Sequence, residues 1–516
     1  MQKRWLVLLN LLVALVCWSA PGGAQQPKLG GTLRLAMPGD MTFFNANQGP
    51  APGYFTFWVW NNLFNSLLTM TPPPEWKVVP ELATSWDVQD GGTTWVFHLA
   101  QGVKFHDGTD FDAQAAKWNV ERILDPEVHS WVRPYYTAID RVEAVDTSTL
   151  RLHMKEPFGS LDRALAGYFQ GIPMASPTSF ATYGKDWVQH PTGTGPFVLK
   201  AWSPGERVVL EKNPHYFKPG LPYLDKLEVR IMKDPLTAST ALRAGEIDFI
   251  PRVPIRQVLV LEKSAGIRLA TGPSMAPTVA LLNLRVKPFD DVRARRAVGG
   301  YGIDREEIAK VGFHGRVQPL VSALPPGVPD AINLNEMYPY NPEKAKQLLQ
   351  ELGYDEKNPL RFTILVGNQD ATLADLATLI KNQMTKIGVE AKINLVDQTT
   401  LIDLFVVKHE FEMMVSNFGS LLDINMGSVS FFHGAQADFV GMNDPTVEAL
   451  VLQWRRMLEP EGRKQISADI QRRLADEMEW VTVTGYPFYQ AYREVVKNYR
   501  FYDQAHLFLE QVWLEK

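Results

Sequence analysis

The chain has 516 residues, of which 45% are hydrophobic and 21% are charged, and its formal net charge is −5 at pH 7. This composition is typical of a globular protein, and the length is too great for one compact core, so we expect two or three lobes. The modest negative charge and the lack of a basic stripe in the sequence argue against a nucleic-acid-binding protein.

The first 24 residues have the pattern of a secretory signal peptide. A basic start is followed by an apolar run over residues 6–16 and by small residues at 22–24. The run is shorter than the stretch of about 20 apolar residues that spans a bilayer. We therefore expect cleavage after Ala24 rather than a membrane anchor.

The only cysteine, Cys17, lies inside this segment. A lipoprotein signal needs a small residue directly before the cysteine, whereas Val16 stands there, so lipid attachment is not expected. A mature chain without cysteine has neither disulfides nor thiol chemistry, and its stability has to come from buried area.

The N-terminal half of the mature chain shows strand patterns. Residues 30–37 alternate like a strand, and so do residues 95–99, which a tight connection joins to residues 103–105. The second pattern predicts a hairpin with one apolar face. Asp110 or Asp112 can cap the helix that follows.

Helix signals dominate the C-terminal half. Asp304 and Glu307 have the spacing of a capping box. Asn341 and Pro342 open a helix that Gly353 closes. Helices are also expected from residue 445 to about 457 and from 460 to about 478, with aromatic strands after residue 480.

A strand–helix–strand unit lies between these helices. Residues 361–366 form a strand, apolar residues keep helical spacing from 373 to 387, and residues 389–395 alternate again. Such a unit implies a parallel pair of strands with a right-handed crossover, so this half is predicted to be α/β.

Residues 80–122 carry the most specific pattern of the chain. They contain Pro80-Glu81-Leu82-Ala83, an alternating strand around Phe97, and the run from Gly102 to Gly108. This block resembles the signature of the bacterial extracellular solute-binding proteins of family 5, the oligopeptide, dipeptide and nickel receptors of ABC importers. Further blocks resemble the same family in the same order: residues 190–197, 210–217, 221–225, 242–248, 288–293, 302–305 and 340–345.

The resemblance implies a class II periplasmic-binding-protein fold, which is α/β with two lobes, three domains and mixed β-sheets. Residues 25–75, 185–285 and 486–516 would form a discontinuous domain of lobe one, and residues 76–184 a subdomain inserted in that lobe. Residues 286–485 would form the α/β domain of lobe two. Two segments would cross between the lobes, near residues 285 and 485.

The function implied by the resemblance is that of a periplasmic receptor and not of an enzyme. A small solute would be held in the cleft by hinge closure and passed to the permease subunits of an ABC importer. The receptor would be a monomer that needs no cofactor, metal or nucleic acid.

The rival interpretation is an exported hydrolase, for instance a glycosidase. Such an enzyme would need two cleft carboxylates about 5–9.5 Å apart. Asp40, Glu75 and Asp423 are available acids, but none lies in a hydrolase motif, and the sequence has no Gly-x-Ser-x-Gly.

Two short motifs that suggest chemistry are interpreted as turns. In His106-Asp107-Gly108, Asp107 can bond its own backbone and Gly108 can take a positive φ. Gly193-Thr194-Gly195-Pro196 lacks the following Lys and the helix start that a phosphate loop needs. The ten histidines do not cluster at metal-ligand spacing, so no zinc site is expected.

The strongest pointer to a ligand is the loop sequence that ends at Asp423. The family reads GWxxD there, with an aromatic residue lining the cleft and an acid three residues later that holds the α-ammonium of a peptide. Phe418 takes the aromatic position, but Leu421 stands where the acid would be, which argues against a free peptide amine. The candidate ligand residues are Phe418, Gly419, Ser420 and Asp423, and the alternative for Asp423 is a helix cap or an exposed position.

An aromatic-rich segment after the first strand lies where the first ligand loop of the family falls. Phe43, Asn45, Tyr54 and Trp58 are its candidate ligand residues, and core packing is the alternative for the aromatic ones. Tyr486, near the second crossing, is a further candidate. Peptide, oligosaccharide, opine-like and metal-chelate ligands are all compatible with these residues.

Overall fold

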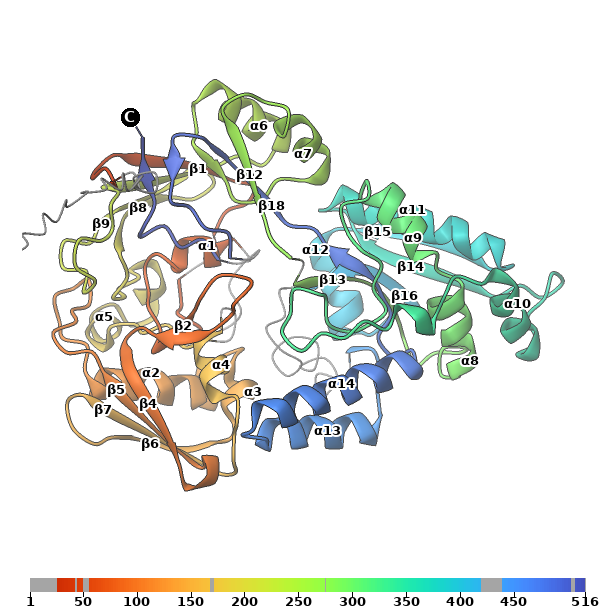
Figure 1. Cartoon of the computed structure of the whole chain (residues 1–516), viewed down its shortest axis with the longest axis horizontal. Helices are drawn as coiled ribbons and strands as arrows, with labels where there is room; N and C mark the ends of the chain where they lie inside the picture. Colours follow the sequence, from red (N-terminus) through yellow and green to blue (C-terminus); the bar gives the residue numbers. More distant parts are fainter. Residues whose placement is uncertain are drawn as a thin grey trace, which may run out of the picture.

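Three β-sheets, of seven, five and four strands, organise the structure. It is a computed structural model that describes residues 26–41, 44–49, 55–167, 171–273, 275–418, 439–502 and 506–515. The predicted signal segment, residues 1–24, lies outside the described residues. In Figure 1 the seven-stranded and four-stranded sheets lie on one side of the molecule and the five-stranded sheet on the other. The structure is therefore mixed α/β, as the sequence predicted.

The seven-stranded sheet is built around β1, whose Leu33 and Leu35 are buried in the core. β1 pairs in parallel with β10 and β11, and the outer strands add in antiparallel orientation. In sheet order the strands are β12 (Ile267–Thr271), β18 (Tyr489–Arg493), β11 (Phe249–Ile250), β1 (Thr32–Met37), β10 (Lys226–Ile231), β9 (Arg207–Lys212) and β8 (Phe197–Ser203). The helices of this part are α1 (Thr56–Trp60), α6 (Pro235–Ala244) and α7 (Ile255–Leu261).

The four-stranded sheet is antiparallel throughout, and its strands lie within residues 76–184, which we call the inserted subdomain after the prediction. Its strands, in order, are β4 (Ala83–Gln89), β5 (Thr94–Leu99), β7 (Thr149–Met154) and β6 (Ile139–Ala144). The helices nearby are α2 (Ala113–Leu124), α3 (Arg133–Tyr136), α4 (Leu161–Ala166) and α5 (Pro177–Tyr183), and β2 (Leu68–Met70) pairs with β3 (Val78–Pro80).

The predicted hairpin of residues 95–105 is wrong. β5 pairs with β4 along one edge and with β7 along the other, so neither edge is left for the segment that follows. That segment folds on itself instead, with Phe105 N donating to Thr109 O at 2.9 Å and Phe111 N donating to Val103 O at 2.9 Å. The pairing of β5 with β4 before it and with β7 after it therefore prevails over the pattern of residues 95–105.

The five-stranded sheet contains the predicted strand–helix–strand unit. β14, α11 and β15 follow one another, and the two strands pair in parallel. In order the strands are β15 (Glu390–Val396), β14 (Arg361–Gly367), β16 (Met413–Asn417), β13 (Ala276–Leu282) and β17 (Thr482–Tyr486). The helices are α8 (Val292–Arg295), α9 (Arg305–Glu307), α10 (Pro342–Glu351), α11 (Ala371–Lys386), α12 (Gln398–Ile402), α13 (Pro445–Arg456) and α14 (Pro460–Asp476).

The chain passes twice between the seven-stranded and the five-stranded sheet. It leaves β12 at Thr271 to enter β13 at Ala276, and it returns from Tyr486 in β17 to Tyr489 in β18. We call the part with the seven- and four-stranded sheets lobe one and the part with the five-stranded sheet lobe two. β13 thus precedes residue 286, the predicted start of lobe two, and contributes to its sheet. A short pair, β19 (Val496–Lys497) and β20 (Trp513–Leu514), follows β18.

The His106-Asp107-Gly108 motif is a turn in the structure, and residues 194–196 form a bend before β8. Asp107 Oδ1 accepts from Thr109 N at 3.0 Å, and Gly108 has a φ of 85°. Burial lowers the pKa of His106 to about 4, so its imidazole is neutral. Gly193 packs so closely that an added Cβ would lie 2.2 Å from the Leu63 carbonyl oxygen, which explains the glycine without any phosphate.

Candidate functional site

A cavity of about 720 Å³ lies between the lobes. Its walls come from the carboxyl ends of β1, β10 and β11 in lobe one and of β14 and β16 in lobe two. Ligands of open α/β sheets bind outside the carboxyl ends of the strands, where the loops converge. Small-molecule sites have volumes of about 300–1,000 Å³, so this cavity has the size and position of a ligand site.

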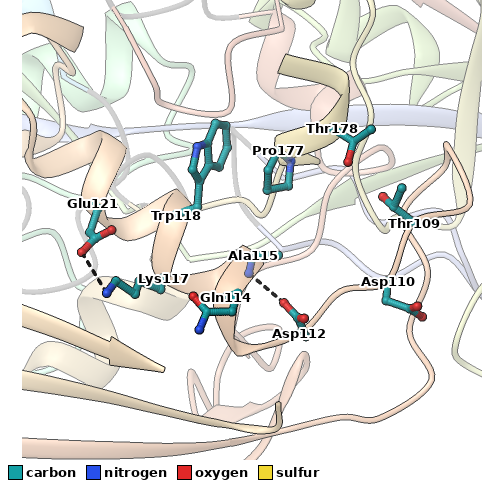
Figure 2. Close-up of a pocket in the computed structure, with 10 residues that line it drawn as sticks. All are labelled: Thr109, Asp110, Asp112, Gln114, Ala115, Lys117, Trp118, Glu121, Pro177 and Thr178. Atoms are coloured by element: carbon teal, nitrogen blue, oxygen red, sulfur yellow. Dashed lines mark hydrogen bonds and ion pairs between the residues drawn. The ribbon is translucent and has the colours of Figure 1, made fainter. Parts of the chain in front are cut away.

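Figure 2 shows a second hollow, of about 410 Å³, beside α2 and α5 of the inserted subdomain. Its polar groups make local contacts: Asp112 Oδ1 caps α2 by accepting from Ala115 N at 2.8 Å, and Lys117 lies 3.6 Å from Glu121. All residues that line it belong to residues 109–121 and 177–178, on one subdomain. A ligand there would not contact both lobes, so we place the candidate site in the cavity between them.

A charged cluster crosses the wall of this cavity. Arg252, which follows β11 in lobe one, has Nη2 at 3.2 Å from Asp370 Oδ2 and 3.3 Å from the hydroxyl oxygen of Tyr486. The Tyr486 hydroxyl also donates to Asp370 Oδ2 in a short hydrogen bond. Burial raises the pKa of this hydroxyl above its ordinary value, which keeps it a proton donor. The cluster therefore joins lobe one, lobe two and the second crossing.

Both acids of the cavity wall begin helices. Asp234 Oδ1 accepts from Thr237 N at 2.7 Å at the start of α6, and Asp370 Oδ1 accepts from Thr372 N at 2.9 Å at the start of α11. Hydrogen bonds from the side chain and backbone of Thr237 lower the pKa of Asp234. Both carboxylates thus serve as N-caps.

The rest of the wall is largely apolar. Phe55 from lobe one, Phe313 from lobe two and Phe488 from the second crossing line it. Phe313 makes an edge contact with Tyr486, with ring centroids 6.1 Å apart. Aromatic faces beside a few fixed charges suit a small ligand that has both apolar and ionic parts.

The predicted site residues fall into three groups. Tyr486 lines the cavity. Three others do not line it. Phe418 follows β16 and packs against Trp480 with ring centroids 5.3 Å apart, and Asn45 and Trp58 are both 1% exposed inside lobe one. Five candidates lie outside the described residues, so their predicted roles stay predictions: Phe43, Tyr54, Gly419, Ser420 and Asp423.

Several residues of the cavity wall were not predicted. Ser416 and Asn417, directly before Phe418, line it, and so do Arg252 and Asp370. Asp370 had a usable signal, because it follows the predicted strand 361–366 and so had to lie at the carboxyl end of that strand. Arg252 had no such signal in the sequence.

The acids proposed for a hydrolase have other surroundings. Asp40 bonds to the Gly205 backbone N–H and receives a hydrogen bond from the Trp202 indole at 3.4 Å, and Glu75 is exposed. Neither is among the residues that line the cavity, and Asp423 lies outside the described residues. Within the part of the chain that the structure describes, no group of three or more His, Cys, Asp or Glu could hold a metal ion.

Comparison with curated proteins finds glutathione-binding relatives. The glutathione-binding protein GsiB of Shigella flexneri is 35% identical over 323 residues, which cover 63% of this chain and 62% of the relative. GsiB of Escherichia coli K12 is 34% identical over 323 residues, which again cover 63% of this chain and 62% of the relative. The match thus spans less than two thirds of the length of these relatives.

Solved structures share the fold over almost the whole chain. The oligopeptide-binding protein AppA from Bacillus subtilis, in complex with a nonapeptide, matches with a TM-score of 0.82 at 23% identity, covering 95% of this chain and 100% of that one. NikA from Staphylococcus aureus, in complex with Ni(L-His)2, matches with a TM-score of 0.80 at 20% identity, covering 94% and 100%. The class II binding-protein fold with two lobes is therefore confirmed.

The model of the bacterial extracellular solute-binding proteins, family 5 Middle, matches residues 77–438. This range contains most of the blocks on which the resemblance was based. In the part that the structure describes, none of the helices is both long and apolar enough to cross a membrane. The chain belongs to the bacterial extracellular solute-binding proteins of family 5.

Proposed function

We propose that this protein is an exported receptor that captures a small peptide-like solute between its lobes and delivers it to an ABC importer. The observation that carries the proposal is the cavity of about 720 Å³ whose wall both lobes contribute. Family membership and the peptide and nickel complexes of the structural neighbours support it. The permease subunits of the importer would recognise the closed form of the monomer.

Hinge closure explains how such a site works. A ligand shifts an equilibrium between open and closed lobes only if it binds one form better than the other. A solute in this cavity would touch Arg252 and Phe55 on lobe one together with Phe313 and Asn417 on lobe two, and it makes both sets of contacts only when the lobes are closed. The free energy of binding therefore shifts the equilibrium toward the closed form.

Glutathione is the first ligand to test. The relatives that are 34–35% identical are named glutathione-binding proteins. Glutathione is a small peptide with carboxylates, and the cavity combines basic side chains with an apolar wall. A micromolar affinity would correspond to about 8 kcal/mol of binding free energy.

The experiment combines calorimetry with small-angle scattering on residues 25–516. Glutathione is expected to bind, to be recovered unchanged, and to lower the radius of gyration. Ala371→Trp, which fills the cavity at the start of α11, should weaken binding by about tenfold or more. Ala374→Trp is the matched control, because Ala374 is on the next turn of α11 and does not line the cavity.

Three results would contradict the proposal. Turnover of glutathione would support the hydrolase interpretation, unchanged scattering on binding would exclude hinge closure, and equal effects of the two tryptophan variants would remove the cavity from the binding site.

We also infer that residues 1–24 are removed on export to the periplasm. The basic start, the apolar run and the small residues before the cleavage point support this inference. Because Cys17 is the only cysteine, the mature protein should react with no thiol reagent. Labelling of the exported protein would place the cleavage site elsewhere.

A further inference from the structure

The wall of the cavity between the lobes has an excess of basic side chains. Three of them, Lys233, Arg252 and Arg256, come from lobe one, against the two acids Asp234 and Asp370. Both acids accept hydrogen bonds from the first turn of a helix. Those bonds and the positive helix ends already stabilise the two carboxylates. Because Asp375, which does not line the cavity, pairs with Arg256, the positive charge that the wall offers to an anion lies on Lys233 and Arg252.

Arg252 is the basic group best placed to receive that charge. Its side chain is 30% exposed and lies on the cavity wall. A guanidinium matches a carboxylate in shape and charge, and such hydrogen bonds are about twice as strong as those between neutral groups. Arg256 is more exposed, at 68%, and pairs with Asp375 at 2.6 Å.

The partner of Arg252 is itself a carboxylate from the opposite lobe. Asp370 Oδ2 lies 3.2 Å from Arg252 Nη2 and also accepts from the Tyr486 hydroxyl. If Arg252 left it, Asp370 would keep two hydrogen bonds, one from Tyr486 and one from Thr372 N. A second carboxylate can therefore replace Asp370 on Arg252 while Asp370 keeps two hydrogen-bond donors, which lowers the cost of breaking the ion pair in a partly buried site.

We propose that Arg252 is the carboxylate receptor of the cavity and that a ligand carboxylate exchanges with Asp370 on its guanidinium as the solute binds. This inference rests on the proposed function and defines its ligand class. The receptor takes solutes with a free carboxylate, such as acidic or C-terminally free peptides. Neutral oligosaccharides and peptide amides offer no group for Arg252, and the receptor discriminates against them.

The test compares glutathione with its diethyl ester, in which both carboxylates are masked, by calorimetry at constant salt. Wild-type protein should bind glutathione about tenfold or more tightly than the ester, because the ester leaves Arg252 on Asp370. Arg252→Gln should bind the two compounds about equally, near the affinity of the wild type for the ester. Arg252→Lys keeps the positive charge but lacks the paired N–H donors of the guanidinium, so it should retain part of the preference for glutathione over the ester.

Two further variants separate the exchange from general effects. Arg316→Gln is the control, since Arg316 also pairs across the lobes, with Glu262 at 2.6 Å, but does not line the cavity. It should keep the full preference for glutathione. Asp370→Asn retains a cap for α11 and competes less for Arg252, so it should bind glutathione at least as tightly as the wild type.

Each outcome bears on a different claim. Equal binding of glutathione and ester by the wild type, or an undiminished preference in Arg252→Gln, overturns the assignment of Arg252 while the receptor function stands. A tenfold weaker binding of glutathione by Asp370→Asn shows that Asp370 contacts the ligand itself and overturns the exchange. Failure of the wild type to bind either compound overturns the proposed glutathione-class ligand and this inference together.

Discussion

At the residue scale, Glu479 is a carboxyl group buried between α14 and β17. It is 7% exposed, and its Oε2 has no hydrogen-bond partner. The charged groups that face it are Asp444, Glu477, Arg295 and Arg473. Burial, with Asp444 adding to it, raises the pKa of Glu479 from 4.5 to about 7. The folded protein therefore holds a proton here that the unfolded chain releases.

Replacing Glu479 by Gln should change how stability depends on pH. As pH rises from 4.5 to about 7, the unfolded chain ionises first, so the free energy of unfolding of the wild type falls by on the order of 3 kcal/mol. The Glu479→Gln variant has no such proton to lose. The stability of the variant relative to the wild type should therefore rise between pH 5 and pH 8, as measured by thermal unfolding at both pH values, and a constant difference would contradict this assignment.

Phe418 tests the ligand loop that the sequence pointed to. Its ring is half-buried on Trp480, and the preceding Asn417 lines the cavity. Phe418→Ala should weaken solute binding by more than about 1 kcal/mol, because aromatic side chains beside a cavity contribute a large share of the contact. Calorimetry measures the affinity and thermal unfolding checks the fold. An unchanged titration in a folded variant would remove Phe418 from the site.

Single residues were predicted well where their role is local. Asp107 bonds two residues along the chain, and Asp112 caps the helix that begins at the next residue. Arg252 was not predicted, because its partner Asp370 is 118 residues away in the sequence and neither residue is in a motif. The candidate site therefore depends on a pairing that only the folded chain creates.

At the element scale, local signals set the bounds of helices, and tertiary contacts decide which partners the side chains at the helix ends bond to. Asn341 caps α10 as predicted, accepting from Lys344 N at 3.0 Å. The predicted capping box of Asp304 and Glu307 forms only by half. Asp304 accepts from Glu307 N at 2.9 Å, but the Glu307 carboxylate accepts from Gln383 of α11 at 2.9 Å. The neighbouring helix supplies a partner that the sequence window did not contain.

Both α13 and α14 form hydrogen bonds with Gly159 of the inserted subdomain. Gly159 N donates to Arg455 O at 2.7 Å, and Gly159 O accepts from Arg463 Nη1 at 2.5 Å. An added Cβ would lie 2.0 Å from Met457 O. Figure 1 shows α13 and α14 reaching toward α3 of the inserted subdomain. This contact links lobe two to lobe one away from the two crossings.

Gly159→Ala should destabilise the protein by about 1–3 kcal/mol, because backbone atoms on both sides would have to move. Gly462→Ala on α14 is the control. Its added Cβ would meet only the flexible side chain of Met457, with Sδ at 2.7 Å, and alanine favours a helix over glycine. Thermal unfolding of the two variants measures the difference. Equal shifts in Tm would mean that the contact at Gly159 adapts without cost.

At the scale of the whole molecule, three ion pairs connect the lobes beside α7. Arg252 lies 3.2 Å from Asp370, Arg256 lies 2.6 Å from Asp375, and Glu262, just after α7, lies 2.6 Å from Arg316. Each lobe-one partner lies on or beside α7, which in Figure 1 faces α11. None of these pairs is deeply buried, so each contributes at most about 1 kcal/mol and is screened by salt.

The ligand-free receptor should therefore open as ionic strength rises. With three pairs weakened, the ratio of open to closed form should increase by about tenfold between low and high salt, and the radius of gyration from small-angle scattering should rise. The ligand-free double variant Arg256→Gln/Arg316→Gln should have a larger radius of gyration than the ligand-free wild type at low salt. Arg361→Gln removes an arginine about as exposed as Arg256. Its partner Glu390, at 2.8 Å, is on the neighbouring strand of the same lobe, so this variant should behave like the wild type. Because the solute contacts both lobes, the liganded protein should stay compact at every salt concentration. If the radius of gyration of the ligand-free protein did not depend on salt, the two covalent crossings and the contact at Gly159 would determine closure without the ion pairs.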